Sequence, residues 1–256
     1  MGGRGGSSHA AGGTARPVDT SVLAGFTTTK EVSRWMKKQK WFTPRAPVDL
    51  EGIAVDAAKS IAMAYKRVFD AYPQVIGKFH GVVALDIGFG TYAQCYLTTG
   101  RIEVNKDIYR DVSTVAQFYD DDIHPERDPS RRGDPPHHPP NTTWEAVVTH
   151  EIGHAINGYL DDALVAYNRQ QILNNGFQNA QTLSLKYRET WQKEIYASHR
   201  LRPTKTNVGK HNSGYAASAP VEWFAESFAE GMDAANPRWA AKMFMEKLNE
   251  LMKKVR

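Results

Sequence analysis

The sequence predicts an α+β fold in which a small mixed sheet packs on one central helix and the C-terminal half of the chain is mainly helical. Three observations support this prediction. Strand-like runs occupy residues 80–109, a helical pattern spans residues 141–160, and the chain beyond that pattern is almost wholly helical. With 256 residues and 41% hydrophobic content, the chain is long enough to bury one good core.

Three segments are expected along the chain. Residues 1–20 are rich in glycine and lack an apolar core region, so they are predicted to be a disordered leader or linker rather than a secretory signal. Residues 21–75 are predicted to contain N-terminal helices, and residues 76–256 the domain that carries the motifs described below. Residues 21–256 together are expected to form one compact unit.

Local signals predict the first two helices. Thr28 and Glu31 have the spacing of a capping box, which predicts a short basic helix through about Phe42. An apolar face that repeats every three or four residues predicts a second helix over about 49–72. These helices either cover the sheet as a packing layer or form a small separate lobe, and the sequence leaves both arrangements open.

Strand-like runs follow at 80–88, 91–99 and 101–109, separated by glycines. A tight turn at 98–100 predicts that the last two runs form a hairpin. Apolar and polar residues alternate along 101–105, which is typical of a half-exposed strand. Such a strand at the edge of the sheet could pair with an extended peptide.

The motif HEIGH carries the chemistry of the central helix. Thr142 and Glu145 have capping-box spacing and predict the start of this helix. His150 and His154 lie about one turn apart on one face, the spacing that two imidazoles need to reach a single metal ion. Glu151 lies beside them, where its carboxylate could accept a proton from a water molecule. The alternative is an ordinary helix with two hydrogen-bonded histidines and an exposed glutamate.

A third ligand must come from elsewhere, because a catalytic zinc ion usually takes three protein ligands and one water molecule. In the extended motif HExxHxxGxxH the third ligand would be a histidine at position 160. This chain has Leu160 there and Asn157 in the glycine position, which excludes that class. His199 and His211 remain possible ligands, although neither lies in a recognisable pattern.

Glutamates recur every four residues in the segment VEWFAESFAEGM. The segment predicts a helix over about 220–232 that carries Glu222, Glu226 and Glu230 near one face. Three buried carboxylates would repel one another unless some of them face a metal ion and its histidine ligands. The alternative is a solvated acidic face, but the helix lacks the lysines at i+4 spacing that usually accompany one.

These two motifs together resemble the gluzincin metallopeptidases. The similarity is strongest to the catalytic domain of anthrax lethal factor and its relatives, which include Pro-Pro endopeptidases and phage-associated peptidase domains. In that group a tyrosine lies seven residues before the glutamate ligand, as Tyr215 lies before Glu222 here, and an EFFAEAF-like helix follows. The resemblance covers about residues 80–235, does not cover the first 75 residues, and implies a zincin-like fold.

The resemblance also implies a role for each residue of the motifs. Three residues would be the ligands of a zinc ion (Zn²⁺): His150, His154 and Glu222. Glu151 would be the general base. Tyr215 would donate a hydrogen bond to the oxyanion of the tetrahedral intermediate, the alternative being a surface tyrosine in a glycine-flanked loop. Glu226 would accept a hydrogen bond from the free ring nitrogen of His150.

The stretch from 120 to 140 is rich in Asp, Pro and Arg and is predicted to be a long exposed loop. It contains His124, His137 and His138. A second metal site there is disfavoured, because a flexible histidine pair bounded by prolines lacks the rigid geometry that metal binding requires. Further helices are expected over about 161–175, 181–200 and 238–254.

The predicted function is that of a zinc-dependent endopeptidase acting on a peptide or protein substrate. One alternative is a zinc-stabilised structural or assembly module, for instance in a phage particle. Another is a basic nucleic-acid-binding protein, which the net charge of +4 and its sparse basic runs disfavour. The oligomeric state is left open.

Composition also bears on the compartment. The only cysteine, Cys95, excludes an internal disulfide and is expected to be a small buried strand residue. No apolar run approaches the roughly 18 residues of a membrane-spanning helix. The protein is therefore expected to be cytoplasmic at synthesis, with virion association or export by a non-classical route left open.

Overall fold

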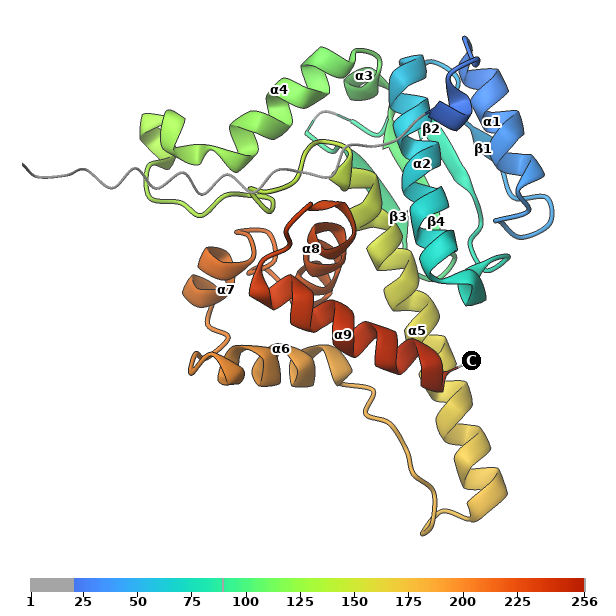
Figure 1. The fold of residues 1–256 in the computed structure, drawn as a ribbon, viewed down its shortest axis with the longest axis vertical. Coiled ribbons are helices and arrows are strands. Elements are labelled where there is room, and N and C mark those ends of the chain that lie inside the picture. Colours follow the sequence, from blue (N-terminus) through green and yellow to red (C-terminus); the bar gives the residue numbers. More distant parts are fainter. Residues whose placement is uncertain (1–20, 89, 256) are drawn as a thin grey trace, which may run out of the picture.

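The structure, a computed structural model, describes residues 21–88 and 90–255. The predicted leader, residues 1–20, lies outside the described residues. Within them, nine α-helices and one four-stranded mixed sheet form an α+β fold, which confirms the predicted fold class at that level (Figure 1).

The sheet has the strand order β1-β2-β4-β3. Its strands are β1 (Val48–Asp49), β2 (Val82–Leu85), β3 (Ala93–Tyr96) and β4 (Arg101–Asn105). β1, β2 and β4 are parallel, and β3 runs antiparallel to β4, so the predicted hairpin is confirmed. Gly100 closes the turn with φ 62°, and its N–H donates to the carbonyl oxygen of Tyr96 at 2.7 Å.

The prediction that residues 101–105 form a half-exposed strand, which could pair with a peptide at a sheet edge, is wrong. β4 lies between β2 and β3 and is mostly buried, so the long free edge belongs to β3. The strand also ends earlier than predicted. The side chain of Asn105 accepts a hydrogen bond from the N–H of Asp107 and starts a short helix, α3 (Lys106–Tyr109).

Two helices precede the sheet, α1 (Thr29–Lys38) and α2 (Val55–Ala71). The capping box of Thr28 and Glu31 is confirmed, although α1 ends before Phe42. α2 begins at Val55 rather than near 49, because Val48–Asp49 pairs with β2 as β1. Both helices contribute to the same hydrophobic cluster as the sheet and α5, so they form a packing layer rather than a separate lobe.

The central element is α5 (Ala146–Asn175), a single helix of 30 residues where two were predicted. Its predicted capping box is wrong: Glu145 precedes the helix without a side-chain cap, and the Thr142 hydroxyl instead donates to the carbonyl oxygen of Pro139 at 2.6 Å. The predicted helix end at about residue 175 is confirmed, and Gly176 follows it with φ 71°. The C-terminal half of α5 extends away from the sheet (Figure 1).

The stretch 120–140 is not wholly exposed, which corrects the prediction. It begins with the last turn of α4 (Val112–Ile123), a helix that the sequence analysis missed, and continues in short 3₁₀ turns at Pro125–Arg127 and Pro129–Arg131. Its end turns inward, so that the imidazole of His138 is buried.

The C-terminal half is helical, as predicted. Its helices are α6 (Tyr187–Ser198), α7 (Lys205–His211), α8 (Pro220–Asp233) and α9 (Trp239–Lys254). α8 and α9 agree with the predicted helices within one residue at each end, whereas α6 begins at Tyr187 rather than at about 181. α7 was not predicted. α8 packs against α5, α6 and α9, and is buried along most of its length. No helix in the described part of the chain is long and apolar enough to cross a membrane.

We expect the substitution Gly158→Ala to destabilise the fold. A Cβ atom at Gly158 of α5 would lie 2.2 Å from the carbonyl oxygen of Leu97, a backbone atom that cannot move aside easily. An exposed helical glycine would gain up to about 1 kcal/mol from alanine, whereas overpacking here should cost about 1–3 kcal/mol. Urea unfolding measures the difference. Gly25→Ala, where nothing lies within 4 Å, is the control; equal stability of Gly158→Ala and the parent would contradict the close packing of α5 on the hairpin.

Candidate metal centre

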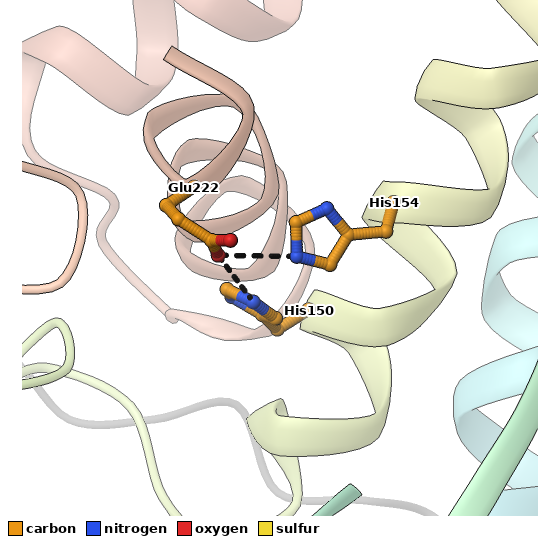
Figure 2. Close-up of side chains that lie close together, drawn as sticks. All are labelled: His150, His154 and Glu222. Atoms are coloured by element: carbon orange, nitrogen blue, oxygen red, sulfur yellow. Dashed lines mark hydrogen bonds and ion pairs between the residues drawn. The ribbon is translucent and has the colours of Figure 1, made fainter. Parts of the chain in front are cut away.

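Two helices bring three predicted ligands together. His150 and His154 on α5 face Glu222 in the first turn of α8 (Figure 2). Oε2 of Glu222 lies 3.3 Å from Nε2 of His150 and 3.1 Å from Nε2 of His154. The ligand atoms of the three side chains all lie within 4.8 Å of one another.

These distances fit a shared ion. Two ligand atoms that each lie about 2.0–2.1 Å from a tetrahedral zinc ion are about 3.3 Å apart. The two measured His–Glu separations are within 0.2 Å of that value. Both imidazoles direct the same nitrogen, Nε2, to one carboxylate oxygen, so the three side chains could bind one ion with little rearrangement.

The glycine of HEIGH explains how the two helices approach so closely. A Cβ atom on Gly153 would lie 3.1 Å from the Cα atom of Ala225 and 3.2 Å from the ring of Phe228. Glycine within a helix costs about 1 kcal/mol relative to alanine. Here the cost is offset by the contact between α5 and α8 that places Glu222 opposite the histidines.

Glu226 lies one turn further along α8, behind His150. Its Oε1 is 2.8 Å from Nδ1 of His150 and 3.1 Å from Nδ1 of His138, and its Oε2 accepts a hydrogen bond from the Ser213 hydroxyl at 2.9 Å. Burial opposes ionisation of this carboxyl, but His138 and His150 outweigh burial and hold its pKa well below the usual range. A charged Glu226 therefore keeps the proton of His150 on Nδ1 and leaves Nε2 free for a metal ion.

Glu151 differs from the other carboxylates. It is buried, and no residue in the described ranges forms a hydrogen bond or ion pair with its carboxylate. Burial raises the pKa of Glu151, while the nearby His150 and His154 act in the opposite direction. A carboxylate with a raised pKa and no fixed partner has the properties of a general base.

Tyr215 lies against the same cluster. Its ring stacks on that of His150 with centroids 5.6 Å apart and an angle of 26° between the planes. Burial and then the charge of Glu222 raise the pKa of Tyr215 to about 12, so the phenol keeps its proton at neutral pH. A protonated phenol is a hydrogen-bond donor, and this one lies beside the three candidate ligands.

Two cavities meet at this cluster. One, of about 370 Å³, is lined by His150, Glu151 and Tyr215, and the other, of about 280 Å³, by Glu151, His154, Tyr215 and Glu222. Residues 91 and 93 of the edge-strand region border both. Cys95 is half-buried and lines the second cavity, so its predicted burial in a strand is only partly correct.

The third glutamate of the stripe has a structural partner. Glu230 is fully buried, and Arg238 donates to both of its carboxylate oxygens at 2.9 and 2.7 Å. Asn141 donates to the same carboxylate at 3.0 Å. The alternative of a solvated acidic face is therefore wrong, and only the N-terminal part of the stripe reaches the candidate ligands.

Four further histidines fall into two groups. His199 stacks on Trp239, the ring of His211 lies tilted against the same tryptophan, and neither histidine is among the clustered ligands. His137 and His138, by contrast, line the cavity beside Glu151. The sequence analysis missed their connection to the site, because no local pattern indicates that the end of a proline-rich stretch packs on α8.

Comparisons of the chain with models of known protein families, with curated proteins and with solved structures find no match.

The cluster predicts a pH dependence for the metal-free protein. Burial opposes the charge of His150, but Glu222 and Glu226 raise its pKa from 6.5 to about 10. The charged imidazole therefore contributes fully to the free energy of unfolding below pH 6.5, and this contribution is lost as the pH rises through 10. Burial also opposes the charge of Glu222, but His150 and His154 lower its pKa from 4.5 to about 2. The contribution of the charged carboxylate to the free energy of unfolding is therefore lost as the pH falls from 4.5 through 2. Both contributions are complete only between pH 4.5 and 6.5.

Urea unfolding of chelator-treated protein tests this dependence. Between about pH 5.5 and 9.5 the parent should lose more free energy of unfolding than Glu222→Gln, because the variant removes one of the two carboxylates that hold the proton on His150. Titration of groups that lie away from Glu222 is common to both proteins and cancels in the comparison. Equal losses in the two proteins would contradict the coupling of His150 to Glu222.

Proposed function

We propose that the protein is a zinc-dependent endopeptidase of the gluzincin type, with a zincin-like arrangement of sheet and active-site helix. The observation that carries the proposal is the convergence of His150, His154 and Glu222 at metal-ligand spacing, next to the unpartnered carboxylate of Glu151. Two imidazoles and one carboxylate are a ligand set that suits zinc and leaves one position open. When bound, zinc would polarise the scissile carbonyl group and acidify the attacking water.

Glu151 is proposed as the general base. Its carboxylate lines both cavities at the cluster, so it can contact a water molecule or a peptide in either cavity. It would accept a proton from the attacking water and then deliver that proton to the nitrogen of the leaving amine. The raised pKa of Glu151 suits both steps. It strengthens the carboxylate as a base, and it keeps the proton on the acid until the leaving amine accepts it.

Tyr215 is proposed as the donor that stabilises the tetrahedral intermediate. Negative charge develops on the former carbonyl oxygen as water adds to the peptide bond, and a fixed O–H donor is most effective there. The Tyr215 phenol lines both cavities together with Glu151, and its pKa of about 12 keeps the proton on the oxygen.

The shape of the cleft supports an extended substrate. The cavity near His150 shares Gly90 and Tyr92 with a further cavity of about 310 Å³, and the cavity near Glu222 shares Leu97 with one of about 320 Å³. The edge strand β3 lies between these ends and could pair with a peptide backbone. Neighbouring cavities on both sides of the cluster favour an endopeptidase, and they also argue against the alternative of a closed zinc-stabilised structural or assembly module.

We expect purified protein to contain about one zinc ion per chain under zinc-replete conditions. The double substitution His150→Ala/His154→Ala should abolish this content, because one carboxylate cannot retain the ion alone. Elemental analysis after gel filtration measures the ratio. The double substitution His199→Ala/His211→Ala is the matched control and should retain the metal; parent protein without stoichiometric zinc would refute the proposal.

We expect Glu151→Gln to retain zinc and the fold but to lose turnover by roughly 10²–10⁴-fold, since an amide cannot accept the proton of the attacking water. The measurement is digestion of a proteome-derived peptide library by the parent and the variant, analysed by mass spectrometry. Cleavage at the parental rate by the variant would show that another residue is the base.

A further inference from the structure

The proline-histidine segment, Pro135–His138, is a conspicuous feature of the sequence that has no role in the proposed reaction. Its backbone lies against the loop that carries Tyr215. The N–H of Gly214 donates to the carbonyl oxygen of Pro136 at 2.6 Å, and the N–H of Tyr215 donates to that of His137 at 3.1 Å. On its other side, the N–H of His137 donates to the carbonyl oxygen of Asp122 at 2.8 Å. The segment is therefore fixed between α4 and the Tyr215 loop.

Close packing strengthens this contact. A Cβ atom at Gly209 or at Gly214 would lie 3.1 or 3.2 Å from Cγ of Pro135. Both glycines therefore let the proline ring approach the backbone of α7 and of the Tyr215 loop. Because proline has a fixed φ and little side-chain freedom, this docking costs less conformational entropy than docking of an ordinary loop.

The side chains continue the contact into the site. The imidazole of His137 stacks on the ring of Tyr215, with centroids 5.0 Å apart and 26° between the planes. The ring of Tyr215 also stacks on that of His150, with centroids 5.6 Å apart and 26° between the planes. Tyr215 thus has an imidazole from the segment and an imidazole of the candidate metal centre as its two stacking partners.

The same segment also reaches the acceptor behind His150. The imidazole of His138 is only 8% exposed, stacks on Tyr119 at 4.9 Å, and contacts Glu226 through Nδ1 at 3.1 Å. Adjacent histidines therefore reach two parts of one centre. His137 stacks on the phenol ring, and His138, whose ring also lies edge-on to Tyr215 at 6.2 Å, contacts the carboxylate behind His150.

We propose that His137 is a positioning residue that holds the ring of Tyr215 against His150, and that the proline-histidine segment is thereby part of the active centre rather than a surface loop. The inference rests on the proposed peptidase function, because it assigns Tyr215 as the donor to the oxyanion. Without the His137 ring, Tyr215 gains freedom about its side-chain torsions, and its hydroxyl spends less time at the position where charge develops. A misplacement of about 1 Å can cost roughly 10²-fold in rate.

A double-mutant cycle tests the role of His137 in catalysis. His137→Ala and His137→Phe are made in the parent and in the Tyr215→Phe background, and kcat and KM are measured on a peptide that the parent cleaves. His137→Ala should lower kcat about 10- to 100-fold with little change in KM, and His137→Phe, which keeps a flat ring, should restore most of the rate. In the Tyr215→Phe background, itself about 10²–10³-fold slower, neither change should have a further effect. An equal loss from His137→Ala in both backgrounds would overturn the proposal, because it would mean that His137 acts independently of Tyr215.

A second measurement does not require activity. In protein with ¹³C-labelled tyrosine rings, the Tyr215 resonances are assigned by their loss in Tyr215→Phe. His137→Ala should shift the Tyr215 resonances, because it removes the ring-current contribution of His137 while the ring of His150 stays, and His137→Phe should retain a contribution of the same sign. His124→Ala, in the preceding part of the 120–140 stretch, is the matched control, since its imidazole contacts Asp120 and Glu126 rather than the centre.

The two measurements separate the possible failures. Unchanged Tyr215 resonances in His137→Ala would overturn the stacking role whether or not the protein is a peptidase. A zinc-loaded protein that shows the expected shifts but cleaves no peptide would refute the proposed function while supporting the contact. Zinc content and unfolding temperature equal to those of the parent verify that each variant is folded.

Discussion

The buried contact between α5 and α8 is the constraint on which the rest of the site depends. It places the imidazoles of His150 and His154, which are both buried, against the carboxylates of Glu222 and Glu226. Removing one ion from water costs several kcal/mol. Charged groups are therefore stable in the interior only where well-placed opposite charges and hydrogen bonds offset this cost. The contact requires a helix without a side chain at Gly153, which links the sequence of the motif directly to the geometry of the site.

Along α8, the three glutamates at four-residue spacing show how one stripe serves two purposes. The exposed fraction of the side chain falls from 18% at Glu222 to 1% at Glu226 and 0% at Glu230. Glu230 pairs with an arginine, which is always charged and has no lone pair to offer a metal ion. Glu222 and Glu226 pair with histidines, which can release a proton from Nε2 and bind a metal ion instead. The end of α8 that holds histidine partners is therefore the end suited to metal binding, and the arginine end stabilises the fold.

The parts of the site that could be predicted from sequence are those encoded by helical periodicity. His150, His154 and Glu222 lie on two strongly patterned helices, and the four-residue spacing fixes which side chains share a face. Thr142 and Glu145 show the limit of such local patterns: Thr142 forms its hydrogen bonds with Tyr119 and Pro139, so tertiary contacts override the capping signal. The position of β4 inside the sheet could not be predicted either, because alternation of apolar residues does not reveal which strand pairs with a neighbour on both sides.

The proline-histidine segment shows why composition is a poor guide to flexibility. Prolines prevent regular strand pairing, which led to the prediction of an exposed loop. The same prolines restrict the unfolded chain, so a segment that contains them loses less entropy when a few good contacts fix it. Here those contacts are two backbone hydrogen bonds to the Tyr215 loop, the packing of Pro135 on two glycines and the burial of His138. The prolines and the histidines of the segment are evident in the sequence. Only the packing of distant residues, however, shows that the segment lies beside the candidate metal centre and not in solvent.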